Sequence, residues 1–291
     1  MKWASITVLA IIAAFLAIVA GYAYTNPGAA QAISLHAANK LGISEKSFCF
    51  FIPNEEIAFD RLETEDLKLW NKSVRFATNP QHLSVSLDNE RDRSVLVQRF
   101  VPSEKGSERA IVSVNVDGRT SYELRQSVFF EKEFDWGQES KSGKFGFGLG
   151  GGSAPSGGDL APDGFTVRPV WRGREDGEIE AAVYVYSADR TQNLPYGDEF
   201  AVPGFRIPKG EWFDVNMRIT MNSELDKSDG ELSISINDEH ELTLPDIQWQ
   251  SEGEKLVIDR LLFSSFHGGN STSWSPKFIV QAKFTDACLY N

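Results

Sequence analysis

Cysteine and histidine are scarce in this sequence. The chain of 291 residues contains two cysteines and four histidines, and the histidines lie far apart along it. Two cysteines cannot by themselves supply the four ligands of a structural zinc site, and scattered histidines do not complete the set. The composition therefore predicts no metal site.

Basic residues are outnumbered by acidic ones. The sequence has 29 lysines and arginines against 41 aspartates and glutamates, a formal charge of −12. A general nucleic-acid binder needs a basic surface to displace counterions from phosphates, so nucleic acid is excluded as a partner. The same charge weakens long-range attraction of any polyanion, and an anionic ligand would need a local cationic patch.

Helical periodicity is nearly absent beyond residue 73, and there are no heptads and no internal repeat. One short helix is expected over 62–71. Apolar and polar residues instead alternate with period two, which is typical of strands with one buried and one solvated face. The clearest runs are 112–116, 213–221, 232–236 and 278–284. Turn signals stand between strands at Asp117-Gly118, Asp229-Gly230 and Asn237-Asp238. The pattern predicts an all-β fold, an antiparallel sandwich or jelly roll.

The N-terminal segment is the one long hydrophobic run. Residues 3–24 carry no charge, and as a helix they would span roughly 33 Å, the thickness of a bilayer core. Ala30-Gln31-Ala32 is a small-x-small cleavage pattern, so 1–32 is expected to be a signal peptide or, if uncleaved, a signal anchor. Both alternatives predict a secreted or extracytoplasmic body, with membrane contact only through this segment.

The rest of the chain is expected to comprise a lead-in segment, 33–72, and a β-domain, 73–291. Cys49 and Cys288 lie in strand-like runs near the two ends of the body. In an oxidising compartment they are disulfide candidates, and the region of Cys49 would then pack against the C-terminal strand. Two buried free thiols are the alternative.

A glycine-rich segment interrupts the alternation. Residues 143–164 include nine glycines. The part 146–151 matches GxGxxG, but no helix follows and no βαβ pattern surrounds it, so we reject a dinucleotide site. The segment is expected to be either a flexible surface loop or a loop whose backbone approaches a ligand.

Two strands after this segment carry polar side chains on a common face. Odd positions of 165–172 and 179–186 are apolar, and a turn-rich link predicts a hairpin centred near Glu175. Thr166 would then face Tyr184, with Arg168 diagonal to it. The polar even positions are Thr166, Arg168, Arg172, Glu180, Tyr184 and Tyr186. Upstream, Lys144 alternates with Phe145 and Phe147, so its ammonium can point the same way.

A cation, a hydroxyl and two phenols on one face suit elimination at a uronic acid. A cation must neutralise the carboxylate so that the C5 proton becomes acidic, a base must remove that proton, and an acid must protonate the departing O4. A phenol beside cations is expected to have a lowered pKa. The plain alternative is the solvated outer face of a sheet.

The order of motifs resembles polysaccharide lyase family 14, a group of alginate and polyglucuronate lyases with a β-jelly roll. The similarity extends from about residue 141 to the C-terminus. It is carried by GKFGFGLGG (143–151), GFTVRPVWR (164–172), YVY (184–186), FSSFHGG (263–269) with SW (273–274), and the hairpin DGEL (229–232) with IND (236–238).

The resemblance implies roles for individual residues. The implied catalytic residues are Lys144, Arg168, Tyr184 and Tyr186. Arg168 with Lys144 would hold the carboxylate, and the two tyrosines would abstract and donate protons. Substrate contacts are implied for Thr166, Arg172, His267 and Trp274. Thr166 replaces the family's serine, Pro169 suggests an edge strand or bulge, and His267 stands where an aromatic residue is expected. No metal or organic cofactor is implied.

The sequence thus predicts an exported lyase that cuts an acidic polysaccharide, alginate or glucuronan, by β-elimination. A jelly roll supports binding as well as catalysis, so a non-catalytic carbohydrate-binding protein is the main alternative. A membrane-tethered structural protein is the third. The combination of lysine, arginine and two tyrosines favours the enzyme.

Overall fold

The computed structural model describes residues 46–139, 141–158, 161–189, 196–254 and 257–291. The predicted signal peptide or anchor lies outside these ranges, as do residues 33–45 of the predicted lead-in segment. Among the described residues, no helix is both long and apolar enough to cross a membrane. The described body forms one compact unit, Ser47–Tyr290, and the division into a lead-in segment and a β-domain at residue 73 stays a prediction.

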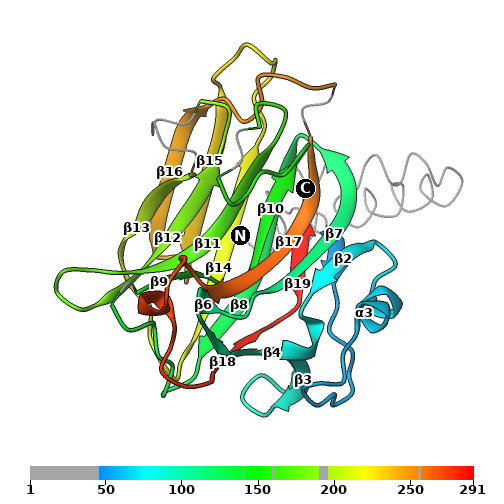
Figure 1. Ribbon diagram of the computed structural model, residues 1–291. Helices are drawn as coiled ribbons and strands as arrows, with labels where there is room; N and C mark the ends of the chain where they lie inside the picture. Colours follow the sequence, from blue (N-terminus) through cyan, green and yellow to red (C-terminus); the bar gives the residue numbers. More distant parts are fainter. Residues whose placement is uncertain (1–45, 140, 159–160, 190–195, 255–256) are drawn as a thin grey trace, which may run out of the picture. The chain divides into compact units, whose positions relative to one another are not determined.

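Two antiparallel sheets make up this body (Figure 1). Sheet A contains, in spatial order, β16 (His240–Ile247), β15 (Gly230–Ile236), β14 (Trp212–Thr220), β8 (Ser121–Phe130), β18 (Val280–Phe284), β4 (Arg93–Phe100) and β3 (Leu83–Asp88). Beside this path, β19 (Ala287–Tyr290) pairs with β8 and with β1 (Lys46–Phe50).

Sheet B contains β13 (Asp198–Arg206), β12 (Ile179–Tyr186), β11 (Phe165–Gly173), β10 (Phe147–Gly151), β17 (Ile258–His267), β7 (Ala110–Arg119) and β2 (Val74–Thr78). The short β9 (Ser142–Lys144) pairs with both β11 and β17. A small sheet joins β5 (Pro102–Ser103) to β6 (Gly106–Ser107). Within the described ranges, the helices are α3 (Thr64–Trp70) and the 3-10 turns η1 (Pro80–His82) and η2 (Thr272–Trp274).

The predicted all-β sandwich is confirmed, and the helix expected over 62–71 is α3. Asn237 and Asp238 both have positive φ and form the tight turn between β15 and β16, as their sequence indicated. Asp117-Gly118 does not form a turn, because β7 continues to Arg119 and the reversal comes at Thr120.

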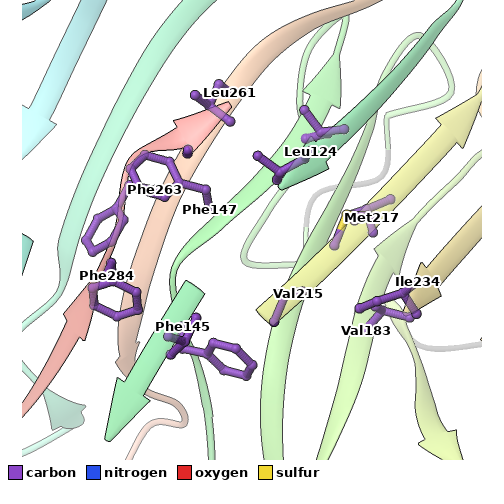
Figure 2. Close-up of a cluster of buried hydrophobic side chains, with 14 of the residues drawn as sticks. Leu124, Phe145, Phe147, Val183, Val215, Met217, Ile234, Leu261, Phe263 and Phe284 are labelled. Carbon is purple, nitrogen blue, oxygen red and sulfur yellow. The ribbon is translucent and has the colours of Figure 1, made fainter. Parts of the chain in front are cut away.

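The hydrophobic core lies between the two sheets. Alternate residues of each strand are buried in it, and Figure 2 shows Phe147 and Phe263 of sheet B beside Phe284 of sheet A. The polar residues between them face away from the core, as period-two alternation requires. The alternation therefore decides which side chains of sheet B are available to a ligand.

A disulfide links Cys49 of β1 to Cys288 of β19, with Cα atoms 4.1 Å apart. Of the two alternatives left open by the sequence, the structure has the bridge. It closes a loop with a sequence separation of 239 residues and ties the first described strand to the last.

The glycine-rich segment is not one long loop. Its first part forms β9 and β10, separated by a kink at Gly146, whose φ is +67°. A side chain at Gly146 would meet Gln126 Oε1 at 2.5 Å, so glycine is required there. Pro169 of β11 lies opposite this kink, and its carbonyl accepts from Phe145 N. The Pro169 nitrogen faces the same break between β9 and β10, so this central strand tolerates the missing donor. Of the two positions expected for Pro169, an edge strand or a bulge, the edge strand is wrong.

The β11–β12 hairpin has a different register from the predicted one. Thr166 pairs with Tyr186 and Arg168 pairs with Tyr184, which centres the hairpin on Asp176. The turn closes through Arg174 N to Glu178 O, with Gly177 at φ +86°. The shift moves each partner by two residues, so every side chain keeps its predicted face.

Candidate active site

The four predicted catalytic residues lie on the outer face of sheet B. Lys144 comes from β9, Arg168 from β11, and Tyr184 and Tyr186 from β12. Their odd-numbered neighbours in β11 and β12 belong to the core cluster between the sheets. The hairpin and the lysine strand therefore bring a cation pair and two phenols to one surface, as the sequence predicted.

Strand β10 places no side chain on the outer face of sheet B beside these four residues. Phe147 and Leu149 point into the core, so Gly148 and Gly150 occupy its outward positions. A Cβ at Gly148 would lie 2.2 Å from Val167 O, and one at Gly150 would lie 3.0 Å from Phe165 O. Glycine is thus required for β10 to pack closely on β11, and no side chain of β10 stands above the sheet.

Lys144 is half-buried and packed between two rings. Its Nζ lies 4.6 Å from the centre of the Tyr184 ring and 5.0 Å from that of Phe266. Burial, reinforced by the positive charges of Arg168 and Arg109 and partly offset by Glu199, lowers the pKa of Lys144 from 10.5 to about 7. A substantial fraction of this amine is therefore neutral near pH 7.

Arg168 is buried, and no carboxylate of the described residues pairs with it. Its side chain is 8% exposed, its Nε has no hydrogen-bond partner, and Nη2 makes only a long contact of 3.5 Å with Pro155 O. Burial lowers the pKa of Arg168 to about 10, which leaves it charged at neutral pH. An unsatisfied buried guanidinium is costly, and a ligand carboxylate would supply the missing hydrogen bonds.

Tyr184 is the more accessible of the two phenols. Its hydroxyl accepts a hydrogen bond from Gly197 N at 3.1 Å, and its ring meets that of Tyr186 edge to face at 5.4 Å. Burial, together with the hydrogen bond and charge of Tyr186, raises the pKa of Tyr184 above its ordinary value of 10.0. The expected lowering by cations is wrong, because desolvation dominates at this position.

Tyr186 and Thr166 are covered by the segment that follows β10. They are 1% and 0% exposed. The Tyr186 hydroxyl accepts from Gly158 N at 3.1 Å, and Thr166 Oγ1 donates to Pro155 O at 2.9 Å. The hydroxyl of Thr166 is thus bonded to the protein and does not present itself to a sugar, contrary to the sequence-based expectation.

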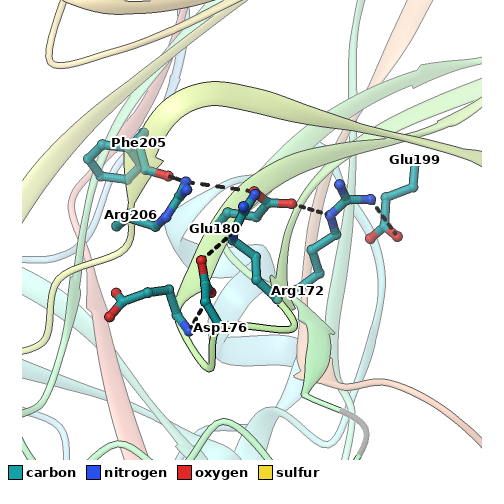
Figure 3. Close-up of polar contacts among 8 residues, drawn as sticks. Arg172, Asp176, Glu180, Glu199, Phe205 and Arg206 are labelled. Carbon is teal, nitrogen blue, oxygen red and sulfur yellow. Dashed lines mark hydrogen bonds and ion pairs between the residues drawn. The ribbon is translucent and has the colours of Figure 1, made fainter.

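Arg172 lies farther along the same face, in a charge network around Glu180 (Figure 3). The Glu180 side chain is 4% exposed and accepts from Arg172 Nε at 2.5 Å and from Arg174 Nη1 at 2.9 Å. Arg206 approaches the same carboxylate at 3.7 Å, and Arg172 Nη1 reaches Glu199 at 3.9 Å. The charge of Arg172 is therefore already compensated, which makes it a weaker anion ligand than Arg168.

His267 does not reach the outer face of sheet B. Its side chain is 0% exposed, its ring stacks on Phe134 with centroids 5.6 Å apart, and Nε2 lies 2.7 Å from Asp135 O. Burial lowers the pKa of His267 to about 4, so the imidazole is neutral. The structure gives His267 a packing role, since this aromatic environment excludes contact with substrate.

Trp274 is half-buried over the loop after β17. A Cβ on Gly269 would lie 2.1 Å from Trp274 Cγ, so the indole packs directly on the backbone of this loop. Gly268 N in turn donates to Ser142 O at the start of β9. Trp274 thus packs against the loop bonded to the strand that carries Lys144, and within the described ranges no hydrogen bond, ion pair or ring contact joins it to the four candidate catalytic residues.

Two charged residues near the site were not predicted from sequence. Glu199 of β13 pairs in register with Tyr184, and burial raises its pKa. Arg109, immediately before β7, stacks over Phe266 with its guanidinium carbon 4.9 Å from the ring centre. Neither stands in a local motif, and only strand pairing brings them to Lys144 and Tyr184.

A depression on sheet A fits an acidic ligand less well. A depression of about 350 Å³ on sheet A has three carboxylates against two arginines in its lining and no aromatic ring. Within the described ranges, no group of three or more histidine, cysteine, aspartate or glutamate side chains is placed to hold a metal ion.

Comparison with known proteins identifies relatives. The model of the family Polysaccharide lyase 14 matches residues 103–287. The alginate lyase Aly36B has 25% identity and a TM-score of 0.68, covering 82% of this chain and 98% of that one. A PL-14 alginate lyase from Aplysia kurodai has 16% identity and a TM-score of 0.65, covering 84% and 99%. No curated protein matches the chain.

A more distant structural match is the endo-β-1,4-glucuronan lyase of the fungus Trichoderma reesei. It has 11% identity and a TM-score of 0.52, and the match covers 85% of this chain and 96% of that one. Aly36B is also known with a lysine and a tyrosine both replaced by alanine, in complex with alginate tetrasaccharide.

Proposed function

The chain belongs to polysaccharide lyase family 14 and is a polysaccharide lyase, and we propose that it cleaves alginate or glucuronan by β-elimination on the outer face of sheet B. The observation that carries this proposal is Arg168. A buried guanidinium with an unsatisfied Nε, beside a lysine and a phenol, is the arrangement that elimination at a uronate requires.

The first step is neutralisation of the substrate carboxylate. Arg168 would bind it and complete the hydrogen bonds that the free protein lacks. Withdrawal of charge from the carboxylate makes the C5 proton more acidic and stabilises the enolate-like negative charge that develops when this proton leaves. The same contact exists in the ground state, so Arg168 contributes to affinity and to rate.

The pKa values of the two adjacent groups assign the proton transfers. Lys144, with a pKa of about 7, has a neutral amine available to accept the C5 proton. Tyr184, whose pKa is raised, holds its proton at neutral pH and is suited to give it to O4. The C4–O4 bond breaks, a C4=C5 double bond forms, and the proton balance is completed by transfer to the leaving oxygen.

Tyr186 and Thr166 form the neighbouring cross-strand pair on the same face of sheet B. Because both are buried under the segment after β10, we assign them to positioning, Tyr186 through its contact with the Tyr184 ring and Thr166 through Pro155 next to Arg168. The sequence-based expectation gave proton transfer to both tyrosines. We assign it to Tyr184 and not to Tyr186, because the Tyr186 side chain is buried.

The N-terminal segment and the disulfide favour an exported protein. A bridge such as Cys49–Cys288 persists in oxidising compartments and is rare in the cytosol of mesophiles. The hydrophobic run over 3–24 is a signal peptide or anchor in this proposal. The substrate would then be a polysaccharide outside the cytoplasm.

A panel of purified polymers tests the proposal. The protein is incubated with mannuronate-rich alginate, guluronate-rich alginate, glucuronan and a neutral glucan, and the unsaturated product is followed by its ultraviolet absorbance. We expect absorbance to rise with at least one polyuronate and not with the neutral glucan. Polyuronate binding without unsaturated product would overturn the lyase assignment in favour of a binding protein.

A further inference from the structure

Arg109 is a third cation at the edge of the site. One strand, β17, separates Arg109 from Lys144. Phe266 of β17 pairs with Lys144 on one side, and the preceding residue, Ser265, pairs with Ala110 on the other. The Arg109 guanidinium carbon and Lys144 Nζ lie 4.9 and 5.0 Å from the centre of the same Phe266 ring. One aromatic ring therefore positions both cations.

The charge of Arg109 is uncompensated. Its side chain is exposed, and among the described residues it forms no ion pair with a carboxylate within 4.0 Å. This contrasts with Arg172, Arg174 and Arg206, which share the carboxylate of Glu180. In a protein with a formal charge of −12, Arg109 and Arg168 have no carboxylate within ion-pair distance among the described residues, and together with the partly protonated Lys144 they form a local attractor for anions.

Arg109 is also held in place before any ligand binds. Its backbone carbonyl accepts from Asn79 Nδ2 at 3.0 Å, and its guanidinium stacks on Phe266. The Phe266 ring is only 8% exposed, so it serves as a support for the cations and not as a stacking surface for a sugar. A guanidinium fixed in this way loses little entropy when it binds a carboxylate through two hydrogen bonds.

We propose that Arg109 forms a second uronate subsite, binding the carboxylate of a sugar that neighbours the one held by Arg168. This inference rests on the proposed function, since a polyuronate carries a carboxylate on every sugar. Arg109 would add affinity and hold the polymer in register without touching the reacting atoms. Its contribution would require a substrate long enough to occupy both subsites.

The test compares Arg109→Gln with wild type on polyuronate and on oligosaccharides of decreasing length. The expected result is a rise in KM for the polymer of about tenfold, with kcat changed by less than about threefold, as loss of one exposed charge-assisted contact predicts. The difference should shrink for the shortest cleavable oligosaccharide. Arg109→Lys, which keeps the charge, should recover part of the affinity.

Arg218→Gln is the matched control, because Arg218 is an exposed arginine in the depression on sheet A. An equal rise in KM for both variants would overturn the proposal, since it would reflect net charge alone. An unchanged KM for Arg109→Gln, or a rise independent of substrate length, would also overturn it. Thermal unfolding of each variant verifies that the fold is retained.

Failure of the lyase assignment is distinguishable from failure of the subsite. Binding of polyuronate to Tyr184→Phe and to Tyr184→Phe/Arg109→Gln is measured by calorimetry, with no turnover required. Weaker binding of the double variant supports the subsite even if no product forms, and equal binding overturns the subsite while leaving the lyase assignment intact.

Discussion

Lys144 and Tyr184 come from different strands of sheet B, yet the lysine ammonium lies 4.6 Å from the centre of the tyrosine ring. Burial lowers the pKa of the amine and raises that of the phenol. The environment thus separates one group that can accept a proton near neutral pH from one that retains its proton. The following predictions depend on this contact and on the residues around it.

Replacing Tyr184 by phenylalanine should remove the proton donor and keep the ring. General acid catalysis typically contributes about 10²–10⁴-fold, so kcat should fall by that order while oligosaccharide affinity stays within about tenfold. Tyr186→Phe is the comparison, since its buried hydroxyl bonds Gly158 N and should affect kcat much less. Steady-state kinetics and calorimetry measure the two effects, and equal losses in both variants would contradict the assignment.

The pH dependence should report on Lys144. If the neutral amine is the base, kcat/KM for the free enzyme should rise with pH through about 7 and then level off. Lys144→Arg keeps a positive charge but cannot release a proton at these pH values, so it should lose most activity at every pH. A pH profile that falls through neutrality, or high activity of Lys144→Arg, would contradict this role.

Removing Arg168 should damage binding and turnover together. Arg168→Ala deletes the partner of the carboxylate in both ground and transition states, so KM should rise and kcat should fall. Arg172→Ala, on the same face but paired with Glu180, should have a smaller effect on both constants. The ratio of the two effects in steady-state kinetics tests whether the unpaired arginine is the carboxylate ligand.

Acid should destabilise the protein through His267. Its pKa is lowered to about 4 from 6.5, so the unfolded chain binds the proton that the folded protein excludes. The stability associated with neutral His267 is therefore present above pH 6.5 and is lost as pH falls towards 4. Thermal unfolding as a function of pH should show this loss, and His267→Phe should reduce it.

His82 provides the control for that measurement. Its pKa is also lowered, chiefly by burial and secondly by Arg99, so it acts in the same direction below pH 6.5. Because His82 is less completely buried than His267, His82→Gln should change the acid sensitivity less. A larger change in His82→Gln than in the His267 variant would contradict the prediction.

Loss of the disulfide should lower the free energy of unfolding. In the chain-entropy model, a bridge across 239 residues stabilises the folded state by about 5 kcal/mol. The double variant Cys49→Ala/Cys288→Ala should accordingly unfold at lower urea concentration. Wild type under reducing conditions should approach the same unfolding midpoint. A wild-type midpoint that does not change when reductant is added would contradict a structural role for the bridge.

The sequence alone determined the fold class and the faces of the strands. Period-two alternation is a local property, and it puts Arg168 and Tyr184 on the face opposite to Val167 and Val183 whatever the pairing partner. A register error of two residues in the predicted hairpin therefore left the candidate site intact. The short motifs around Lys144, Arg168 and Tyr184 were sufficient to indicate the family.

Tertiary structure decided which of these residues are accessible and what else joins them. Thr166 and Tyr186 lie on the outer face of sheet B, as predicted, but the segment after β10 covers them. The position of that segment depends on long-range packing. His267 is directed into an aromatic cluster, and Arg109 and Glu199 reach the site only through strand pairing. Depth of burial and cross-strand register arise from contacts between distant parts of the chain, and no local pattern encodes them.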